Sequence, residues 1–306
     1  ARAVCDEDTP QFSESDWKSF NKKEKEDILQ KYRLAFLSDT WVNWCEGLGT
    51  VLANDEVKDG VSERGGHPIE QKLMRQWSMR ITAYADRLLN DLETLDWSDS
   101  IKEIQRNWIG KSKGASISFE VEGHDAQIEV FTTRPDTIFG VSFMVLAPEH
   151  ELTQKITTQA QKEEVYAYVQ QATLKSERDR QSDVKNISGA FTGAHAIHPF
   201  TGKKLAIWIG DYVLASYGTG AVMAVPCGDQ RDWNFAQHFG INIINIFQDV
   251  DLSEAANEDK LTVIANYEFL SGLSSTEAIQ KSIEEIEEKG IGKNRTNYRL
   301  RDAIFS

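Results

Sequence analysis

The sequence of 306 residues has few cysteines and no long apolar run. Its three cysteines, Cys5, Cys45 and Cys227, lie far apart and form no C-x-x-C pair, which argues against a disulfide framework. No stretch of about 18 apolar residues occurs, so the sequence predicts no transmembrane helix. The first ten residues contain no apolar segment of the kind that a signal peptide needs. We therefore expect a soluble, reduced, cytoplasmic protein.

Positive charge is also scarce. The chain has 34 Lys and Arg against 48 Asp and Glu, a formal net charge of −14. Binding a long nucleic-acid duplex requires many phosphate contacts, so this balance argues against that function. It leaves open a short single-stranded end, where base stacking and edge contacts contribute more. The apolar fraction of 40% is that of an ordinary globular protein, and the length allows one large domain or two modest ones.

The N-terminal third of the sequence predicts helix more than strand. Apolar spacing of three and four residues favours helices over 24–37 and 73–95, and a shorter helix over 98–108. Residues 42–61 are rich in turn-forming residues and predict an irregular segment. The glycine- and lysine-rich stretch 110–114 predicts a linker.

Beyond residue 114 the apolar residues alternate with polar ones, which predicts a β-hairpin over 117–130. Shorter apolar runs predict strands at 141–147, 205–209, 212–215, 220–225 and 241–247. Helical patterns predict helices at 149–174, 229–239 and 276–289, the last with a capping box at Ser274 and Glu277. This order predicts an α+β fold: a barrel-like β-sheet with peripheral helices, plus a smaller, mostly helical N-terminal segment.

The histidines and cysteines predict neither a metal centre nor a nucleophile. The six histidines form no H-E-x-x-H motif and lie near no cysteine pair, so we expect no bound metal. No G-x-S-x-G motif occurs. Cys227 follows Pro226 without a histidine nearby in the sequence, which favours a buried, inert thiol.

The first segment that could carry chemistry is FTTRPDT at 131–137. It presents the hydroxyls of Thr132, Thr133 and Thr137 together with the charges of Arg134 and Asp136. Hydroxyls and free backbone N–H groups at a strand end suit a polarised carbonyl or an ordered water. A turn whose side chains merely cap local backbone would use the same residues. The residues alone leave both interpretations open.

The second segment is YGTGAVMAVP at 217–226, which contains Tyr217, Met223 and Val225. Its glycines would let the backbone approach a ligand closely, and the following strand would supply an apolar wall. A tight turn into a buried strand explains the same pattern, and the residues alone favour that simpler interpretation.

The third segment is DQRDW at 229–233, which opens a helix. Asp229 is well placed as the N-cap, and this role explains it fully. Asp232 lies three residues later on roughly the same face and is explained less well by capping. Two carboxylates there would form an anionic pocket suited to a ligand ammonium group.

Taken together, TTRPDTIFG at 132–140, GTGAVMAVP at 218–226 and DQRDW at 229–233 resemble, in order, three motifs of the editing domain of leucyl-tRNA synthetases. Flanking segments resemble the sequence that leads into and out of that domain: 43–57, 81–97, 106–110 and 297–302. The resemblance covers about residues 31–306. It divides the chain into a helical or irregular segment at 1–109, the editing domain at 110–297 and a return strand at 298–306.

The sequence also departs from this family. Many members carry a zinc-binding lobe around the motif NWC, but here only Cys45 remains and Leu48 stands where a partner cysteine would be. We therefore expect that lobe without its zinc. Relatives often have a small residue and a histidine where this chain has Cys227 and Gly228. The HIGH and KMSKS signatures of the synthetic site are absent, so we expect ATP and Mg²⁺ only for a full-length synthetase and no cofactor for this chain.

The resemblance implies that the chain hydrolyses the aminoacyl ester of tRNA(Leu) charged with norvaline, isoleucine or a similar amino acid. It implies that Thr132 and Thr133 hold the carbonyl or the water and that Asp232 binds the substrate ammonium group. Further residues are implied in substrate binding and specificity: Arg134, Asp136, Thr137, Tyr217, Met223, Val225, Asp229 and Arg231. The expected partners are the 3′ end of tRNA(Leu) and the mischarged amino acid, with no membrane, and the expected state is a monomer. The alternative is a non-catalytic module that binds the tRNA acceptor end or is purely structural.

Overall fold

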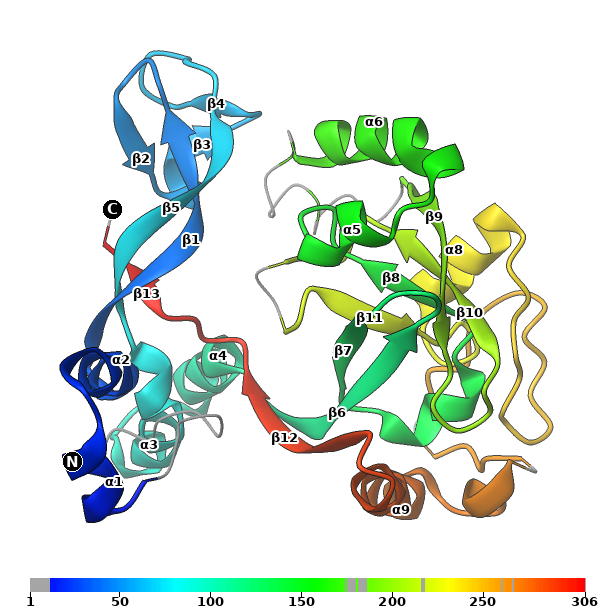
Figure 1. Cartoon of the computed structure of the whole chain (residues 1–306). Coiled ribbons are helices and arrows are strands. Elements are labelled where there is room, and N and C mark those ends of the chain that lie inside the picture. Colours follow the sequence, from blue (N-terminus) through cyan, green and yellow to red (C-terminus); the bar gives the residue numbers. More distant parts are fainter. Residues whose placement is uncertain are drawn as a thin grey trace. The chain divides into compact units, whose positions relative to one another are not determined.

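The computed structural model describes residues 12–173, 175, 180, 186–215, 218–259, 261–265 and 267–305 (Figure 1). The chain forms two compact units, which are described separately. Unit 1 comprises Ala1–Lys111 and Tyr298–Ser306, and unit 2 comprises Ser112–Asn297. Within the described residues, no helix is long and apolar enough to cross a membrane.

The helices of unit 1 begin at side-chain caps. The helices α1 (Glu14–Ser19) and α2 (Lys22–Tyr32) both start with a capping box, because the side chains of Ser13 and Asn21 accept hydrogen bonds from the first helical turn. Four further short helices follow: η1 (Asn54–Glu56), η2 (Ile81–Tyr84), α3 (Ala85–Asp91) and η3 (Leu92–Thr94). The last helix, α4 (Asp99–Ile109), ends at Gly110, which adopts the left-handed conformation. Glycine in this conformation is common at helix C-termini.

The rest of unit 1 is a four-stranded sheet with the strand order β13-β5-β1-β2. Strands β1 (Ala35–Cys45) and β5 (Glu70–Met79) form a long antiparallel ribbon that is visible in Figure 1. Strands β2 (Thr50–Leu52) and β13 (Ala303–Ile304) pair with its two edges. A separate pair is formed by β3 (Val57–Lys58) and β4 (Val61–Ser62).

The expectation of a mostly helical N-terminal segment is not confirmed. The predicted helix over 73–95 is wrong over its first part, because β5 occupies those residues. Leu73 and Trp77 explain the error, since residues four apart share a face in a strand as well as in a helix. Pairing with β1 selects the strand over the helix. Strand β1 itself begins inside the predicted helix over 24–37.

Unit 2 is built on a seven-stranded sheet with the order β11-β8-β10-β9-β6-β12, and β7 pairs with β6 off this path. Its strands are β6 (Lys111–Val121), β7 (Gln127–Thr132), β8 (Phe143–Leu146), β9 (Ala190–Ile197), β10 (Lys204–Ile209), β11 (Ala221–Ala224) and β12 (Gly292–Tyr298). Strands β8 and β10 are parallel. Strand β11 lies near β7, but no ladder joins them among the described residues. The expected barrel-like closure is therefore not confirmed, and the fold is a mixed α/β arrangement of open sheets.

Several predicted elements of unit 2 are confirmed. The hairpin is formed by β6 and β7, with Ile117 opposite Val130 and Phe119 opposite Ile128. The helices α8 (Gln230–Phe239) and α9 (Ser275–Glu288) are present, and α9 has the predicted capping box. Other helices within the described part of unit 2 are η4 (Pro135–Gly140), α5 (Glu151–Ile156), η5 (Gln159–Gln161), α6 (Lys162–Thr173) and η6 (Glu268–Leu270).

Other predictions for unit 2 are wrong. The single helix expected over 149–174 is broken, because Thr157 is extended where α5 ends. Residues 212–215 form turns instead of a strand, and 241–247 contributes only an isolated bridge from Phe247 to Ile264. The expected linker at 110–114 is largely the start of β6.

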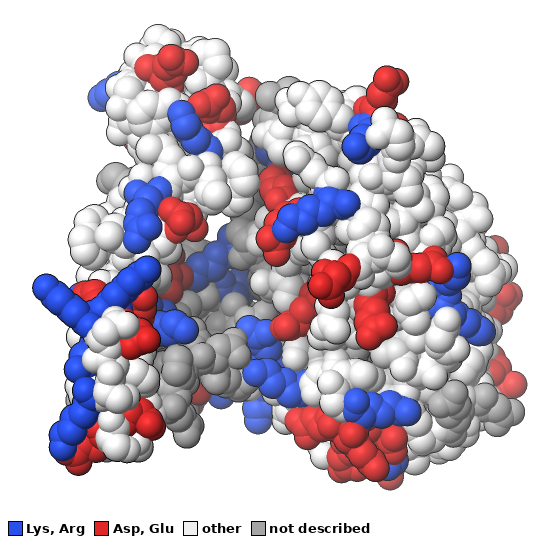
Figure 2. Space-filling model, viewed as in Figure 1, with Lys and Arg blue, Asp and Glu red and all other residues white. Residues whose placement is uncertain are grey.

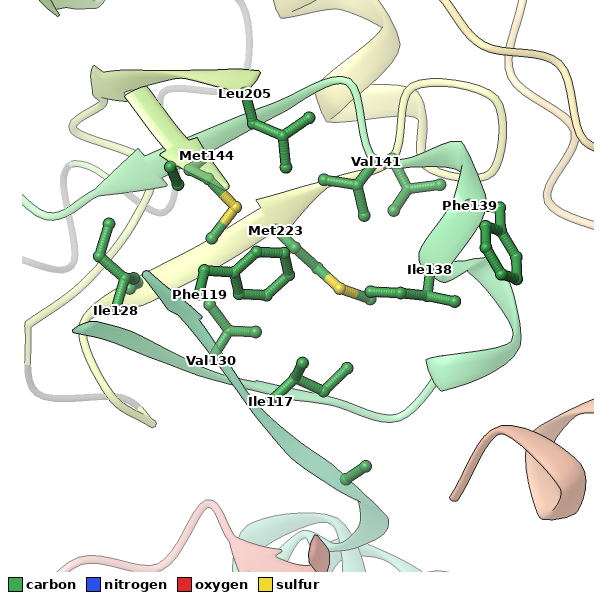
Figure 3. Close-up of a cluster of buried hydrophobic side chains, with 14 of the residues drawn as sticks. Ile117, Phe119, Ile128, Val130, Ile138, Phe139, Val141, Met144, Leu205 and Met223 are labelled. Atoms are coloured by element: carbon green, nitrogen blue, oxygen red, sulfur yellow. The ribbon is translucent and has the colours of Figure 1, made fainter. Parts of the chain in front are cut away.

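The core of unit 2 lies on both faces of β8, which explains its continuous apolar sequence. Met144 and Leu146 join the main cluster, whereas Phe143 and Val145 pack with Phe235 of α8 in a second cluster. Figure 3 shows the main cluster between the sheet and η4, with Met223 of β11 directed toward Ile138 of η4. The threonine-rich turn thus rests directly on the core.

Candidate functional site

The threonine-rich turn begins where β7 ends, at Thr132. The Thr132 Oγ1 accepts a hydrogen bond from the Arg134 backbone N–H at 3.0 Å. Arg134 then folds its guanidinium onto Asp136, with Nε to Oδ1 at 3.0 Å and Nη2 to Oδ2 at 2.8 Å. The Asp136 side chain is fully buried. A charge-assisted, two-point contact of this kind fixes the turn and occupies both charges.

The three threonine hydroxyls of this turn have different surroundings. Thr137 is only 3% exposed, and its Oγ1 donates to the Arg134 carbonyl at 2.8 Å. Thr133, in contrast, is exposed. The capping interpretation of this segment therefore applies to Thr132 and Thr137, and Thr133 is the threonine most open to a substrate.

The glycine-rich segment leads into β11. Gly218 and Gly220 have φ angles of +66° and +69°, a left-handed conformation that favours glycine. The Gly220 carbonyl accepts from the Ala147 N–H at 2.8 Å, which ties the turn to the end of β8. Met223 and Val225 belong to the main core cluster, where they are 7% and 6% exposed. In a binding site at this place, Met223 and Val225 would form the buried apolar layer beneath it. Tyr217 lies outside the described residues.

The aspartate segment opens α8. As the sequence predicts, Asp229 is the N-cap, and its Oδ1 accepts from the backbone N–H groups of Arg231 at 2.9 Å and Asp232 at 3.2 Å. Asp229 and Arg231 are both exposed. Asp229 therefore caps the start of the helix, and this cap does not use the Asp232 carboxylate.

Asp232 is a second buried carboxylate of the candidate site, with an exposure of 8%. Its Oδ2 accepts from the Val225 backbone N–H at 2.7 Å, and its Oδ1 accepts from the Tyr212 hydroxyl at 3.2 Å. Burial, with a smaller contribution from the Asp229 charge, raises the pKa of Asp232 to about 7, although both hydrogen bonds oppose this rise. A buried carboxylate whose pKa is perturbed in this way is a candidate for a functional position.

Tyr212 is the residue of this arrangement that the sequence missed. It lies in the turn after β10, where a strand was expected, and the sequence contains no motif that links it to Asp232. Only the three-dimensional arrangement of β10, β11 and α8 brings the hydroxyl and the carboxylate together.

At Gly140, the end of η4 contacts Cys227, which lies between the glycine-rich and aspartate segments. A Cβ atom added to Gly140 would lie 2.8 Å from the Cys227 Sγ and 3.2 Å from a Val225 methyl group. Cys227 is fully buried, and this burial raises the pKa of its thiol to about 12. The thiol is therefore protonated and packs against the end of η4, and the predicted burial of Cys227 is confirmed. Among the residues that the structure describes, no group of three or more His, Cys, Asp or Glu could hold a metal ion.

Comparisons with known proteins identify the family that the chain is similar to. The family model described as "Leucyl-tRNA synthetase, editing domain" matches residues 106–287. The leucine–tRNA ligase of Christiangramia forsetii is 62% identical over 305 residues, covering 99% of this chain and 32% of that relative. The leucine–tRNA ligase of Flavobacterium johnsoniae is 61% identical, also covering 99% of this chain and 32% of the relative.

A solved structure is similar as well. It is a crystal structure of the ternary complex of the Agrobacterium radiobacter K84 agnB2 LeuRS, tRNA and LeuAMS, and it matches with a TM-score of 0.70 at 34% identity. The match covers 92% of this chain and 32% of that chain. This chain thus spans about a third of the length of its relatives. With the family model covering more than half of its residues, the chain belongs to the family of leucyl-tRNA synthetase editing domains.

Proposed function

We propose that this chain carries out post-transfer editing as part of a leucine–tRNA ligase. The reaction is hydrolysis of the ester between tRNA(Leu) and a wrong amino acid such as norvaline or isoleucine. The observation that carries this proposal is the buried Asp232 carboxylate, held by Val225 and Tyr212 in the first turn of α8. Family membership supports the same reaction.

A second hydrolytic site answers a physical limit of the first. A binding pocket separates side chains that differ by one methylene by only about 1–3 kcal/mol, so a synthetic site accepts some wrong amino acids. A separate site that rejects the correct amino acid removes these products. Leucine must therefore be excluded from the site described here.

The described residues supply distinct parts of such a site. The Asp232 carboxylate binds the substrate α-ammonium group by a charge-assisted hydrogen bond, for which its oxygens keep free lone pairs. Thr133, exposed beside the fixed Thr132, holds the ester carbonyl or the attacking water. Arg134 and Asp136, which pair with each other, hold the turn in shape. Most of the rate then comes from positioning the water and the ester.

Thr137 provides the specificity. Its hydroxyl is used by the Arg134 carbonyl, so its methyl group is the part that remains for steric exclusion. A β-branched residue with a fixed rotamer can clash with one of the two methyl groups on the Cγ of leucine. The same residue can tolerate norvaline, which is unbranched, and isoleucine, which branches at Cβ. A steric clash of this kind discriminates against leucine.

The tRNA contact is restricted to its single-stranded 3′ end. Unit 2 has 16 Lys and Arg against 26 Asp and Glu, a net charge of −10. Acidic side chains gather around α9 in Figure 2. Such a surface does not favour a phosphate-rich duplex. The ternary complex of the related synthetase with tRNA supports a tRNA substrate for this chain.

A deacylation assay tests the proposal against the alternative of a non-catalytic module. The chain is mixed with tRNA(Leu) charged with radiolabelled norvaline, and separately with leucine, and loss of the ester is followed. We expect rapid loss of norvaline and little loss of leucine. Binding of the charged tRNA without faster ester loss than in buffer would favour the non-catalytic module.

A further inference from the structure

The hydroxyl of Tyr212 contacts the one carboxylate to which the proposed function assigns the substrate ammonium group. The Tyr212 hydroxyl lies 3.2 Å from the Asp232 Oδ1, and the Val225 N–H lies 2.7 Å from the Oδ2. The two donors approach different oxygens, so together they fix the plane of the carboxylate. Neither comes from α8, the helix that carries Asp232.

Packing holds the Tyr212 ring in place. Its centroid lies 5.8 Å from that of Phe235, and the ring packs against the second core cluster. Gly210 provides the space beside it, because a Cβ atom there would lie 2.9 Å from the Tyr212 ring and 3.0 Å from a Val145 methyl group. A glycine at this position and the tilted ring contact with Phe235 of α8 leave the hydroxyl little freedom to turn away from Asp232.

We propose that Tyr212 is a positioning residue for the proposed hydrolysis: its hydroxyl, together with the Val225 N–H, holds the Asp232 carboxylate in the orientation that receives the substrate ammonium group. This inference rests on the proposed function. It adds a residue that no sequence motif indicates and that acts through Asp232.

The charges around Asp232 explain why a donor is needed. Burial and the neighbouring Asp229 carboxylate disfavour the ionised form of Asp232, whereas Arg231, the Val225 N–H and the Tyr212 hydroxyl favour it. The Cys227 thiol beside the site is protonated and adds no charge. Burial and the nearby Asp232 raise the pKa of Tyr212 well above its usual value, so Tyr212 remains a donor throughout the neutral range. Loss of this donor would raise the pKa of Asp232 further.

The direct test is the titration of Asp232 in the wild-type chain and in Tyr212→Phe, followed by the ¹³C shift of its carboxyl carbon in protein labelled at aspartate. The Asp232→Asn spectrum assigns the signal. We expect the midpoint to rise by about one pH unit in Tyr212→Phe, since a hydrogen bond to a charged group contributes at least that much. In Gly210→Ala, which keeps the hydroxyl but displaces the ring, we expect a shift in the same direction.

The matched control is Tyr168→Phe. The Tyr168 hydroxyl accepts from the Asp211 N–H at 2.8 Å and donates to the Ser188 carbonyl, so it supports the same turn without touching Asp232. Its removal is expected to leave the Asp232 titration unchanged.

The second readout is the pH profile of kcat/KM for deacylation of norvalyl-tRNA(Leu). In Tyr212→Phe we expect a value about tenfold lower at pH 6 and within about twofold of the wild type at pH 8.5, because only the ionised fraction of Asp232 changes. A purely structural role would lower the rate equally at both pH values.

The outcomes separate this inference from the proposed function. An Asp232 titration that is the same in wild type and Tyr212→Phe overturns the inference, and so does a shifted titration with an unshifted pH profile. A wild-type chain that does not hydrolyse the ester contradicts the proposed function and the catalytic part of the inference, and the titration still decides whether Tyr212 controls Asp232.

Discussion

Gly140 and Cys227 are packed so closely that a single added carbon atom at Gly140 would lie 2.8 Å from the Cys227 sulfur. Gly140 ends η4, which carries the threonine-rich turn, and Cys227 lies between β11 and Asp229. Two segments separated by about 90 residues in sequence therefore meet across one glycine.

We predict that Gly140→Ala destabilises unit 2. The added methyl group would push the Cys227 and Val225 side chains away from residue 140. Overpacking of a buried site costs about 1–3 kcal/mol. Urea denaturation measures this loss. Gly228→Ala is the matched control, because the nearest atoms to an added Cβ there are 3.6 Å away or more. Equal stability of Gly140→Ala and the wild type would show that the two segments separate easily.

We predict that stability depends on pH through Asp232. Its pKa of about 7 in the folded chain exceeds the ordinary value of 3.8, so the folded state binds this proton more tightly than the unfolded state. The contribution of Asp232 to stability therefore falls as pH rises from about 4 through 7. Asp232→Asn, which stays neutral, should be more stable than the wild type at pH 8 by at most about 4 kcal/mol, with a difference that shrinks toward pH 4.

Thermal unfolding between pH 4 and 8 measures this difference. The same change at an exposed position, Asp125→Asn, controls for the loss of one charge. A wild type that is more stable than Asp232→Asn at pH 8 would mean that the carboxylate is stabilised in its ionised form.

We predict that the two roles of Thr137 can be separated. Thr137→Ser keeps the hydrogen bond to the Arg134 carbonyl but lacks the methyl group, so it should hydrolyse correctly charged leucyl-tRNA(Leu) with little loss of stability. Thr137→Val keeps the branched shape without the hydroxyl, so it should still spare leucine and lose about 1 kcal/mol of stability. Deacylation of both esters and urea denaturation compare the pair. If Thr137→Ser still spares leucine, the methyl group does not provide the specificity.

We predict weak tRNA binding with a shallow dependence on salt. A contact limited to the single-stranded end by a unit with a net charge of −10 should involve roughly three phosphates. The slope of log K against log salt should then be no steeper than about −2. Filter binding between 50 and 200 mM salt measures this slope, and a value near −5 would indicate an extensive phosphate contact.

Local signals in the sequence predicted the parts of the fold that depend on near neighbours. The capping box of Ser274 and Glu277 located α9, and the alternation around Ile117 and Val130 located the hairpin. The ribbon of β1 and β5 was missed because its apolar spacing also fits a helix, and only pairing between distant segments decides. The break after α5 was missed for lack of a glycine or proline.

In the candidate site, too, the local features were predicted and the contacts between distant segments were not. Asp229 was predicted as an N-cap because capping is local, and the structure confirms it. From sequence, Asp232 is a carboxylate on the first turn of a helix, and its contacts with Val225 and Tyr212 could not be foreseen. Both contacts depend on how α8 packs against β10 and β11. The contact between Arg134 and the buried Asp136 joins residues only two apart, but it was not predicted, because the sequence alone leaves both side chains free to contact a substrate.

The central claim is that Asp232 anchors the ammonium group of a mischarged ester, and single-turnover hydrolysis of norvalyl-tRNA(Leu) by the wild type and Asp232→Asn tests it most directly. Asparagine is chosen because its oxygen can still accept from the Val225 N–H, so the fold is kept while the charge is lost. A charge-assisted hydrogen bond contributes about 1.5–3 kcal/mol, so we expect hydrolysis to slow by about 10- to 150-fold. Hydrolysis by Asp232→Asn at the wild-type rate would contradict the claim and place the ammonium group elsewhere.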